Sequence, residues 1–169
     1  MGLIVSPLSQ VEAVLRARKP SHVLTLLAPE GPDPSCGDAR HLVLRFNDIA
    51  APMDGYIAPN AAIVRAILGF GAEWKAAATG APLLVHCFAG ISRSTAAAYI
   101  LACEFAGLGR EEDLAWDLRT ASPSATPNSL MVTLADAILG REGRMIAAIQ
   151  AIDRGAFASE GVPFDLLFD

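Results

Sequence analysis

The chain has 169 residues, of which 53% are hydrophobic, and its formal net charge is −5 at pH 7. This length and apolar content exclude an intrinsically disordered chain and suit one domain with a full core over residues 1–169. The acidic balance argues against a nucleic-acid partner, because binding phosphate backbones needs a basic face. No apolar run reaches the ~18 residues that a membrane-spanning helix needs, so we expect no membrane partner.

The cysteine usage predicts a reducing, cytoplasmic location. The three cysteines show no paired spacing, which is unlike a disulfide framework, and residues 1–7 lack the basic and apolar regions of a signal peptide. Cys103 falls in an apolar helical segment and is expected in the core. Cys36 lies in a loop rich in Pro and Gly and is either an ordinary thiol or a redox partner of Cys87. No His, Cys, Asp or Glu cluster has metal-ligand spacing, so we expect no metal and no cofactor.

Strand and helix signals alternate through the first half of the chain. Apolar runs and period-two alternation predict strands over residues 3–5, 22–28, 41–46 and 82–87. Ser9 is expected to cap a helix that ends near residue 19, and Pro59-Asn60 to open one that ends near residue 78. Beyond the last of these strands the chain is expected to be helical to its end, with helices over 93–105, 110–121, 127–139 and 142–151.

This order of elements predicts an α/β fold. We expect a three-layer domain in which helices flank a central, mostly parallel sheet of four or five strands, with a helical C-terminal half. The segment 82–87 is apolar throughout, as expected for a central strand covered on both faces. Because open α/β sheets bind ligands at the carboxyl ends of their strands, we expect the functional site in the residues that follow.

From His86 to Ser94 the sequence reads H-C-F-A-G-I-S-R-S. Five residues separate Cys87 from Arg93, a spacing that closes a loop whose backbone N–H groups can point at one anion, next to the positive end of the following helix. A thiol at the base of such a loop is expected to be a thiolate nucleophile. Arg93 offers a planar fork for two oxygens, which Lys cannot copy. Gly90 permits the tight loop and the close approach of backbone to ligand.

This string resembles the active-site signature of the cysteine-dependent protein tyrosine phosphatases. The similarity is greatest to their small dual-specificity-like branch, whose loop reads His-Cys, two variable residues, Gly, one variable residue, then Ser-Arg-Ser or Ser-Arg-Thr. The signature covers about ten residues and every fixed position is filled. The resemblance implies a phosphotyrosine protein phosphatase-like fold and makes residues 1–169 a single phosphatase domain. The high Ala content and the compact loops suggest a bacterial member.

The resemblance also implies a role for each residue of the loop. Cys87 would attack phosphorus and form a cysteinyl-phosphate, while Arg93 would bind two equatorial oxygens. The hydroxyl of Ser94 would hydrogen-bond the departing sulfur. His86 would orient the loop, although a buried imidazole at a strand end also has a purely structural interpretation. The phosphate-binding backbone groups would belong to Phe88, Ala89, Gly90, Ile91, Ser92 and Arg93.

A phosphatase of this family also needs a general acid, which it takes from an Asp on a loop after an earlier strand. Two residues qualify, Asp48 and Asp54. We favour Asp48 because it directly follows the strand HLVLRF and the end of a strand fixes where a side chain projects. Its alternative role is that of an Asx-turn residue that closes the strand. The Trp-Pro-Asp triplet of the larger tyrosine phosphatases is absent.

Two further segments, residues 119–128 and 164–168, have sequence features of interest. Similar phosphatases carry an Arg- or Asn-containing turn that supports the active-site loop, and Arg119 and Asn128 are candidates for it here. The alternative for the same segment is a plain helix start, with Thr126 as N-cap and Pro127 at the first helical position. The closing residues 164–168 are apolar enough to dock on the body of the protein or on a partner.

The chain is therefore interpreted as a phosphoric monoester hydrolase of the protein tyrosine or dual-specificity phosphatase type. Its expected partners are a phosphorylated protein or peptide, and a phosphate or sulfate ion in the loop. Three alternatives remain. An inositol phosphate or phospholipid phosphatase would favour Lys in the loop, which here holds Phe88, Ala89 and Ile91. A rhodanese-like sulfurtransferase would not need the Ser-Arg-Ser ending, and a non-catalytic module would bind phosphoproteins without releasing phosphate.

Overall fold

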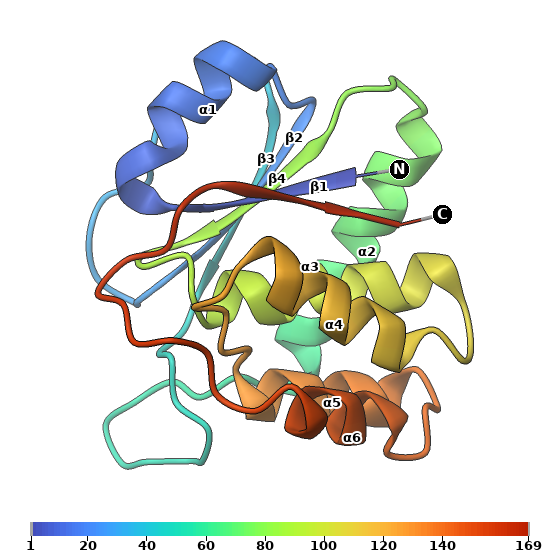
Figure 1. Cartoon of the computed structure of the whole chain (residues 1–169). Coiled ribbons are helices and arrows are strands. Elements are labelled where there is room, and N and C mark those ends of the chain that lie inside the picture. Colours follow the sequence, from blue (N-terminus) through green and yellow to red (C-terminus); the bar gives the residue numbers. More distant parts are fainter. Residues whose placement is uncertain (1, 169) are drawn as a thin grey trace.

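The computed structural model describes residues 2–168 and contains a five-stranded sheet (Figure 1). The spatial order of the strands is β3-β2-β4-β1-β5. The first four strands of that order are parallel, and β5 runs antiparallel to β1. The strands are β1 (Gly2–Pro7), β2 (His22–Leu27), β3 (Arg40–Arg45), β4 (Leu83–Cys87) and β5 (Phe164–Leu167). The predicted mostly parallel sheet is confirmed.

The helices lie on both faces of this sheet, unequally divided. In Figure 1, α1 covers one face alone, while the other helices gather on the opposite side. None of the helices within residues 2–168 has the length and apolar character needed to cross a membrane. After a short 3-10 turn (Leu8–Gln10), the helices are α1 (Val11–Arg18), α2 (Ala61–Ala77), α3 (Arg93–Ala106), α4 (Glu111–Ala121), α5 (Ser129–Ile138) and α6 (Arg144–Ala151). The three-layer α/β fold is therefore as predicted.

The strand β4 is fully buried because it lies between β2 and β1 with helices on both faces. Leu83 and Val85 pack into the large core cluster beneath α2 and α3, and Leu84 packs into a smaller cluster beneath α1. Successive side chains of a strand point to opposite faces, and both faces are covered here. Apolar residues are therefore needed at every position, which is why the sequence shows no alternation. This central position puts the carboxyl end of β4, with Cys87, in the middle of one sheet edge.

The helix α3 packs closely because its buried residues are mostly small. Ala96, Ala97, Ala98 and Ala102 are fully buried. A Cβ on Gly71 of α2 would lie only 2.3 Å from Leu101 Cδ2, so the lack of a side chain there lets α2 and α3 approach each other. Close packing of this helix fixes the position of its N-terminus, which directly follows the candidate loop.

The C-terminal segment differs from the prediction, because the chain is not helical to its end. The last helix ends at Ala151, and after twelve residues without regular secondary structure the chain adds β5 to the edge of the sheet. Leu166 is buried in the main core, and Asp165 pairs with Arg18 of α1 at 2.7 and 3.1 Å. The apolar tail therefore docks on the body of the protein. A four-residue strand is too short to show a period, so local patterning could not identify it.

The starts of the first two helices agree with the prediction to different degrees. The helix predicted to open at Pro59-Asn60 does so, and the Asn60 side chain caps α2 by accepting a hydrogen bond from the backbone N–H of Ile63. Ser9 does not cap α1, because it lies inside the preceding 3-10 turn and its hydroxyl donates to Glu160 at 2.7 Å. The Ser side chain is used instead to hold the C-terminal segment against the start of the chain.

A buried ion pair joins α4 to the turn before α6. Arg141 Nη1 lies 3.0 Å from Glu111 Oε1, and the two side chains are 5% and 3% exposed. Arg141 Nη2 also donates to the carbonyl of Cys103 in α3, and the Glu111 carbonyl accepts from the Tyr99 hydroxyl. The Arg144 side chain is partly exposed, and its Nε lies 3.6 Å from the same carboxylate, so it is a weaker second cation. The pair therefore links α3 and α4 to the turn before α6.

Replacing Arg141 by Met should lower the free energy of unfolding by about 3–5 kcal/mol, because the Glu111 carboxylate then stays buried without its main cation. The double variant Glu111→Met/Arg141→Met removes both charges and should recover a large part of that loss. Urea unfolding of the wild type and the variants measures both effects. A double variant less stable than Arg141→Met would contradict this interpretation.

Candidate active site

The H-C-F-A-G-I-S-R-S segment forms a loop between the end of β4 and the start of α3, as the motif predicts. Cys87 is the last residue of β4 and is 2% exposed. Its Sγ lies 3.1 Å from Ser94 Oγ and accepts a hydrogen bond from the backbone N–H of Gly90 at 3.3 Å. The sulfur therefore sits inside the loop, and Ser94 is in the position that its predicted role requires.

The carbonyl groups of the loop are bonded to the surrounding scaffold. In a trans peptide the carbonyl and the next N–H point in opposite directions, and no peptide bond in residues 2–168 is cis. Carbonyls that turn outward therefore turn the following amides toward the sulfur, as the contact from Gly90 illustrates. The four bonds are Leu8 N to Phe88 O (3.1 Å), Gly161 N to Ala89 O (2.8 Å), Thr126 N to Ile91 O (2.9 Å) and Asn128 N to Ser92 O (3.3 Å).

The loop needs glycine at position 90 for two reasons. Its φ is +70°, a conformation that favours glycine. A Cβ there would also lie 2.7 Å from the backbone nitrogen of Pro7, at the end of β1. The sequence argument predicted a close approach of the backbone to a ligand, and the structure shows that Gly90 also approaches the backbone of a neighbouring strand.

Arg93 begins α3 and is nearly fully buried. Its Nη1 donates to the carbonyl of Phe46, the residue after β3, at 2.8 Å. Its Nε is buried and has no hydrogen-bond partner within residues 2–168. A buried donor without a partner costs free energy, so this N–H is available for an oxyanion that enters the loop.

Asp48 reaches the loop from the segment after β3. Its Oδ1 accepts two hydrogen bonds, from the hydroxyl of Ser92 at 2.7 Å and from Nδ2 of Asn128 at 2.8 Å. Both bonds end on the same oxygen, and neither involves Oδ2. Asp54 lies in an exposed turn, and no hydrogen bond or ion pair connects it to the loop within the described part of the chain. The geometry therefore favours Asp48 over Asp54.

The segment after α4 supports the loop through backbone hydrogen bonds, as one of the two interpretations of Arg119 and Asn128 expected. Arg119 donates to backbone carbonyls on two segments, among them Ala125 at 2.8 Å and Asp153 at 2.8 Å. Asn128 holds Asp48 and also caps α5 by accepting from the N–H of Met131. The expectation that Thr126 is the N-cap is wrong, because Asn128 takes that position.

His86 lies behind the loop and is completely buried. Its Nε2 is 2.6 Å from Oγ1 of Thr25, a hydroxyl that also lies 2.7 Å from Nε2 of His41. Burial first, and His41 second, lower the pKa of His86 to about 4. The imidazole is therefore neutral at physiological pH. Sequence reasoning missed Thr25 and His41, because no local pattern connects them to the motif.

The other two cysteines differ from Cys87 in their surroundings. Burial raises the pKa of the Cys103 thiol to about 12, which fits its predicted place in the core. Burial also raises the pKa of Cys36, which packs in the smaller cluster beneath α1, whereas Cys87 belongs to the cluster on the other face of the sheet. All three are free thiols, so Cys36 and Cys87 are not paired here.

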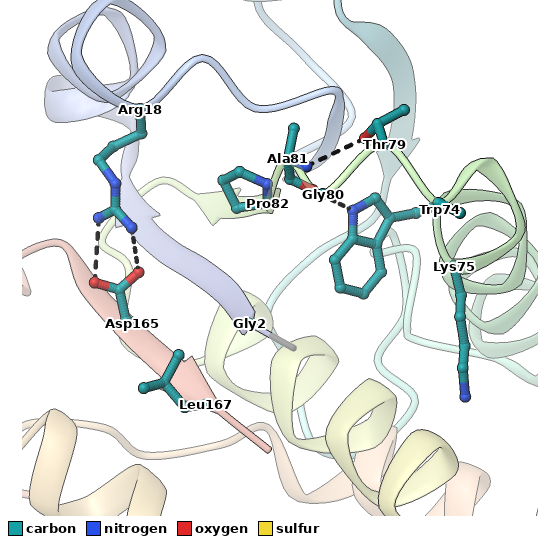
Figure 2. Close-up of a pocket in the computed structure, with 11 residues that line it drawn as sticks. Gly2, Arg18, Trp74, Lys75, Thr79, Gly80, Ala81, Pro82, Asp165 and Leu167 are labelled. Carbon is teal, nitrogen blue, oxygen red and sulfur yellow. Dashed lines mark hydrogen bonds and ion pairs between the residues drawn. The ribbon is translucent and has the colours of Figure 1, made fainter. Parts of the chain in front are cut away.

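Of two cavities in the described structure, one lies far from this loop and the other borders it. One of about 540 Å³ lies at the amino ends of β1 and β4, where the Arg18–Asp165 ion pair and the indole of Trp74 line it (Figure 2). That is the opposite end of the sheet from Cys87. The other, of about 260 Å³, is lined by Ile91 and Ser92 of the loop together with Arg154 and Phe157. The smaller cavity therefore continues the candidate site.

The sequence matches no protein-family model and no curated protein at a significant level. Solved structures are similar in fold. DUSP15 aligns with a TM-score of 0.62 and 21% identity, with 88% of each chain covered. Human DUSP28 aligns at 0.60 and 20% identity, with 88% of this chain and 94% of that one covered. A mouse putative dual specificity phosphatase, complexed with zinc tungstate, aligns at 0.53 and 23% identity, covering 84% and 79%. At these identities the similarity establishes a dual-specificity phosphatase fold.

The burial of His86 has a consequence for acid stability. The unfolded chain protonates this imidazole near its ordinary pKa of 6.5, whereas the folded protein resists protonation until its pKa of about 4. The unfolded state thus binds more protons in this window, and stability falls as the pH falls. Between pH 7 and about pH 4.5 the loss from His86 alone should be about 2.5 kcal/mol.

Urea unfolding of the wild type and His86→Gln at both pH values measures this contribution. The variant should lose about 2.5 kcal/mol less than the wild type over the same pH interval, because its amide does not titrate. Equal losses in the two proteins would show that His86 is not held neutral by the fold.

Proposed function

We propose that this chain is a phosphomonoester hydrolase, a protein tyrosine or dual-specificity phosphatase that works through a cysteinyl-phosphate. One observation carries the proposal. The sulfur of Cys87 accepts a hydrogen bond from the Gly90 amide inside a loop whose carbonyls are bonded outward, and Arg93 at the end of this loop has a buried Nε–H without a partner among residues 2–168. A thiolate nucleophile surrounded by anion-binding donors is the arrangement that phosphoryl transfer to sulfur requires.

In the first step Cys87 Sγ attacks phosphorus while the bond from phosphorus to the ester oxygen breaks. The loop amides and Arg93 hold the three equatorial oxygens as charge spreads over them. Asp48 gives the proton on Oδ2 to the leaving oxygen, while its Oδ1 stays held by Ser92 and Asn128. The products of this step are a protonated alcohol or phenol and a phosphoryl group on sulfur.

In the second step water attacks the cysteinyl-phosphate. The Asp48 carboxylate takes a proton from this water, and the phosphorus–sulfur bond breaks to return the Cys87 thiolate. The Ser94 hydroxyl, 3.1 Å from the sulfur, donates a hydrogen bond that stabilises the leaving thiolate. Inorganic phosphate is released, and no oxidant, metal or cofactor enters the balance.

The surroundings of the loop favour a phosphorylated protein as substrate over an inositol phosphate that carries several phosphates. Phe88 in the loop is 66% exposed and Phe157 on the C-terminal segment is 97% exposed. Arg154 is the cation among the residues that line the neighbouring cavity. Exposed aromatic side chains suit a peptide, whereas an inositol phosphate needs several cations to meet its additional phosphates.

We also infer the setting in which the enzyme works. Cys36, Cys87 and Cys103 are free thiols, which supports a reducing compartment such as the cytoplasm. Residues 1–169 would act as a single phosphatase domain, in which the loop depends on segments from both ends of the chain.

The test is turnover of an aryl phosphate and a phosphotyrosine peptide in the presence of a metal chelator, with vanadate as inhibitor. The wild type should release phosphate, vanadate should block it, and Cys87→Ser should abolish it. Cys103→Ala, which changes a core thiol on α3, is the matched control and should keep activity. Binding of phosphopeptide without release of phosphate would contradict the proposal and support a non-catalytic module. Sulfur transfer from thiosulfate would support a sulfurtransferase.

The role of Asp48 is tested by the leaving-group dependence of turnover. Asp48→Asn keeps the oxygen that Ser92 and Asn128 bind but cannot supply a proton. It should lower turnover by ~10²–10⁴-fold on phenyl phosphate and much less on p-nitrophenyl phosphate, whose leaving group is already acidic. Asp54→Asn is the matched control and should behave like the wild type. If Asp54→Asn shows the leaving-group effect instead, Asp54 is the acid.

A further inference from the structure

The peptide bond between Ala89 and Gly90 is held from both sides. Its carbonyl, on Ala89, accepts a hydrogen bond from the backbone N–H of Gly161 at 2.8 Å. Its N–H, on Gly90, donates to the sulfur of Cys87 at 3.3 Å. Because the carbonyl and the N–H of a trans peptide point in opposite directions, the bond from Gly161 fixes the direction of the Gly90 amide. Gly161 therefore lies behind the amide that contacts the candidate nucleophile.

Gly161 belongs to the C-terminal segment, residues 152–163, which connects α6 to β5. In Figure 1 this segment, drawn in red, runs from α6 past the end of β4 before the chain returns beside β1. Gly161 is buried, and a Cβ there would lie 3.1 Å from the carbonyl oxygen of Gly90 and 3.4 Å from that of Ala89. The first of these distances is tighter than ordinary van der Waals contact. The lack of a side chain at Gly161 therefore lets the segment lie against the loop.

A side-chain hydrogen bond connects this contact to the support of the neighbouring carbonyl. The backbone N–H of Leu8 donates to the carbonyl of Phe88 at 3.1 Å. The next residue, Ser9, donates its hydroxyl to Oε1 of Glu160 at 2.7 Å, and Glu160 directly precedes Gly161. The two bonded side chains are 151 positions apart in the chain. Two consecutive carbonyls of the loop are thus held by donors whose neighbouring side chains bond to each other.

The bond between Ser9 and Glu160 is placed to resist movement of the C-terminal segment away from the loop. A hydroxyl that donates to a carboxylate forms a charge-assisted hydrogen bond, which is stronger than one between neutral groups. Both side chains are exposed, so substitutions there leave the core packing and the residues of the loop unchanged. The pair therefore offers a means of loosening Gly161 without altering the loop itself.

We propose that Gly161 is a positioning residue that aims the Gly90 amide into the anion site. The bond between Ser9 and Glu160 holds Gly161 in that position. The inference rests on the proposed phosphatase function, in which this amide stabilises first the thiolate and then an oxygen of the phosphoryl group. The three positioning residues act through one peptide of the loop, and none of them touches the substrate. Without the bond from Gly161 this peptide is free to rotate, and a carbonyl that faces the sulfur opposes its negative charge.

The first test measures the ionisation of the Cys87 thiol, which needs no turnover. The ultraviolet absorbance of the thiolate is followed against pH, as the difference between each protein and its Cys87→Ser form, so that the signals of the other two cysteines cancel. Glu160→Ala should raise the midpoint of this titration by about 0.3–0.7 pH unit, a two- to fivefold change in ionisation, because the amide is then held less firmly. The loss of a negative charge by itself acts in the opposite direction, since a carboxylate disfavours a nearby thiolate.

Three further variants check the cause of this shift. Ser9→Ala removes the same hydrogen bond without a change of charge and should raise the midpoint by a similar amount. Glu160→Gln keeps an acceptor oxygen for the hydroxyl and should not raise it. Glu12→Ala, the matched control, removes an exposed carboxylate of α1 that pairs with Arg16, and it should also leave the midpoint where it is or lower it.

The second test measures the affinity of the loop for inorganic phosphate by titration calorimetry, which also needs no turnover. Gly161→Ala places a methyl group 3.1 Å from the carbonyl oxygen of Gly90 and should displace the C-terminal segment from the loop. It should weaken phosphate binding by about 3- to 10-fold, the effect of losing one net hydrogen bond. Glu160→Ala should weaken it less, because the backbone N–H of Gly161 is still present.

The outcomes separate failure of the inference from failure of the function. If Ser9→Ala, Glu160→Ala and Gly161→Ala keep the wild-type midpoint and phosphate affinity, or lose only thermal stability, the positioning role is refuted while the phosphatase stands. If Gly161→Ala does not fold, the variants of the exposed pair still decide. If the midpoint shifts as expected but the wild type releases no phosphate from any ester, the positioning role holds and the proposed function fails.

Discussion

The site depends on one constraint, the outward direction of the carbonyls in the loop from Phe88 to Ser92. Each of four carbonyls is bonded to a donor outside the loop, and planar trans peptides then turn the following amides toward the sulfur of Cys87. The proposed anion site is therefore formed before any anion binds. Donors fixed in advance cost no reorganisation during the reaction, which is the usual source of electrostatic catalysis.

These outside donors come from distant parts of the chain. They belong to the 3-10 turn after β1, to the segment before α5 and to the C-terminal segment before β5. Gly90 allows the contact with β1, because any side chain there would collide with the backbone of Pro7. Arg119 holds the second and third segments together by donating to the carbonyls of both. The C-terminal segment thus has two tasks, since it extends the sheet and also supports the loop.

The sequence predicted those features that are encoded locally. The apolar run before Cys87 predicted a central strand, and the resemblance of the following loop to a phosphatase signature implied a contact of Ser94 with the sulfur. The end of the third strand similarly predicted where Asp48 projects. Other features depend on pairing between distant segments and have no local signal. The strand β5 is too short to show a period, Ser9 bonds to Glu160 instead of capping a helix, and Thr25 meets His86 only because β2 and β4 are neighbours.

The most direct measurement of the central claim is rapid acid quench of the enzyme during turnover of an aryl phosphate, followed by mass spectrometry of its peptides. The account predicts one phosphoryl group on the peptide that contains Cys87, in larger amount in Ser94→Ala, where the thiolate leaves less readily. Release of phosphate without any adduct on Cys87 in either protein, or with the adduct on another residue, would contradict it.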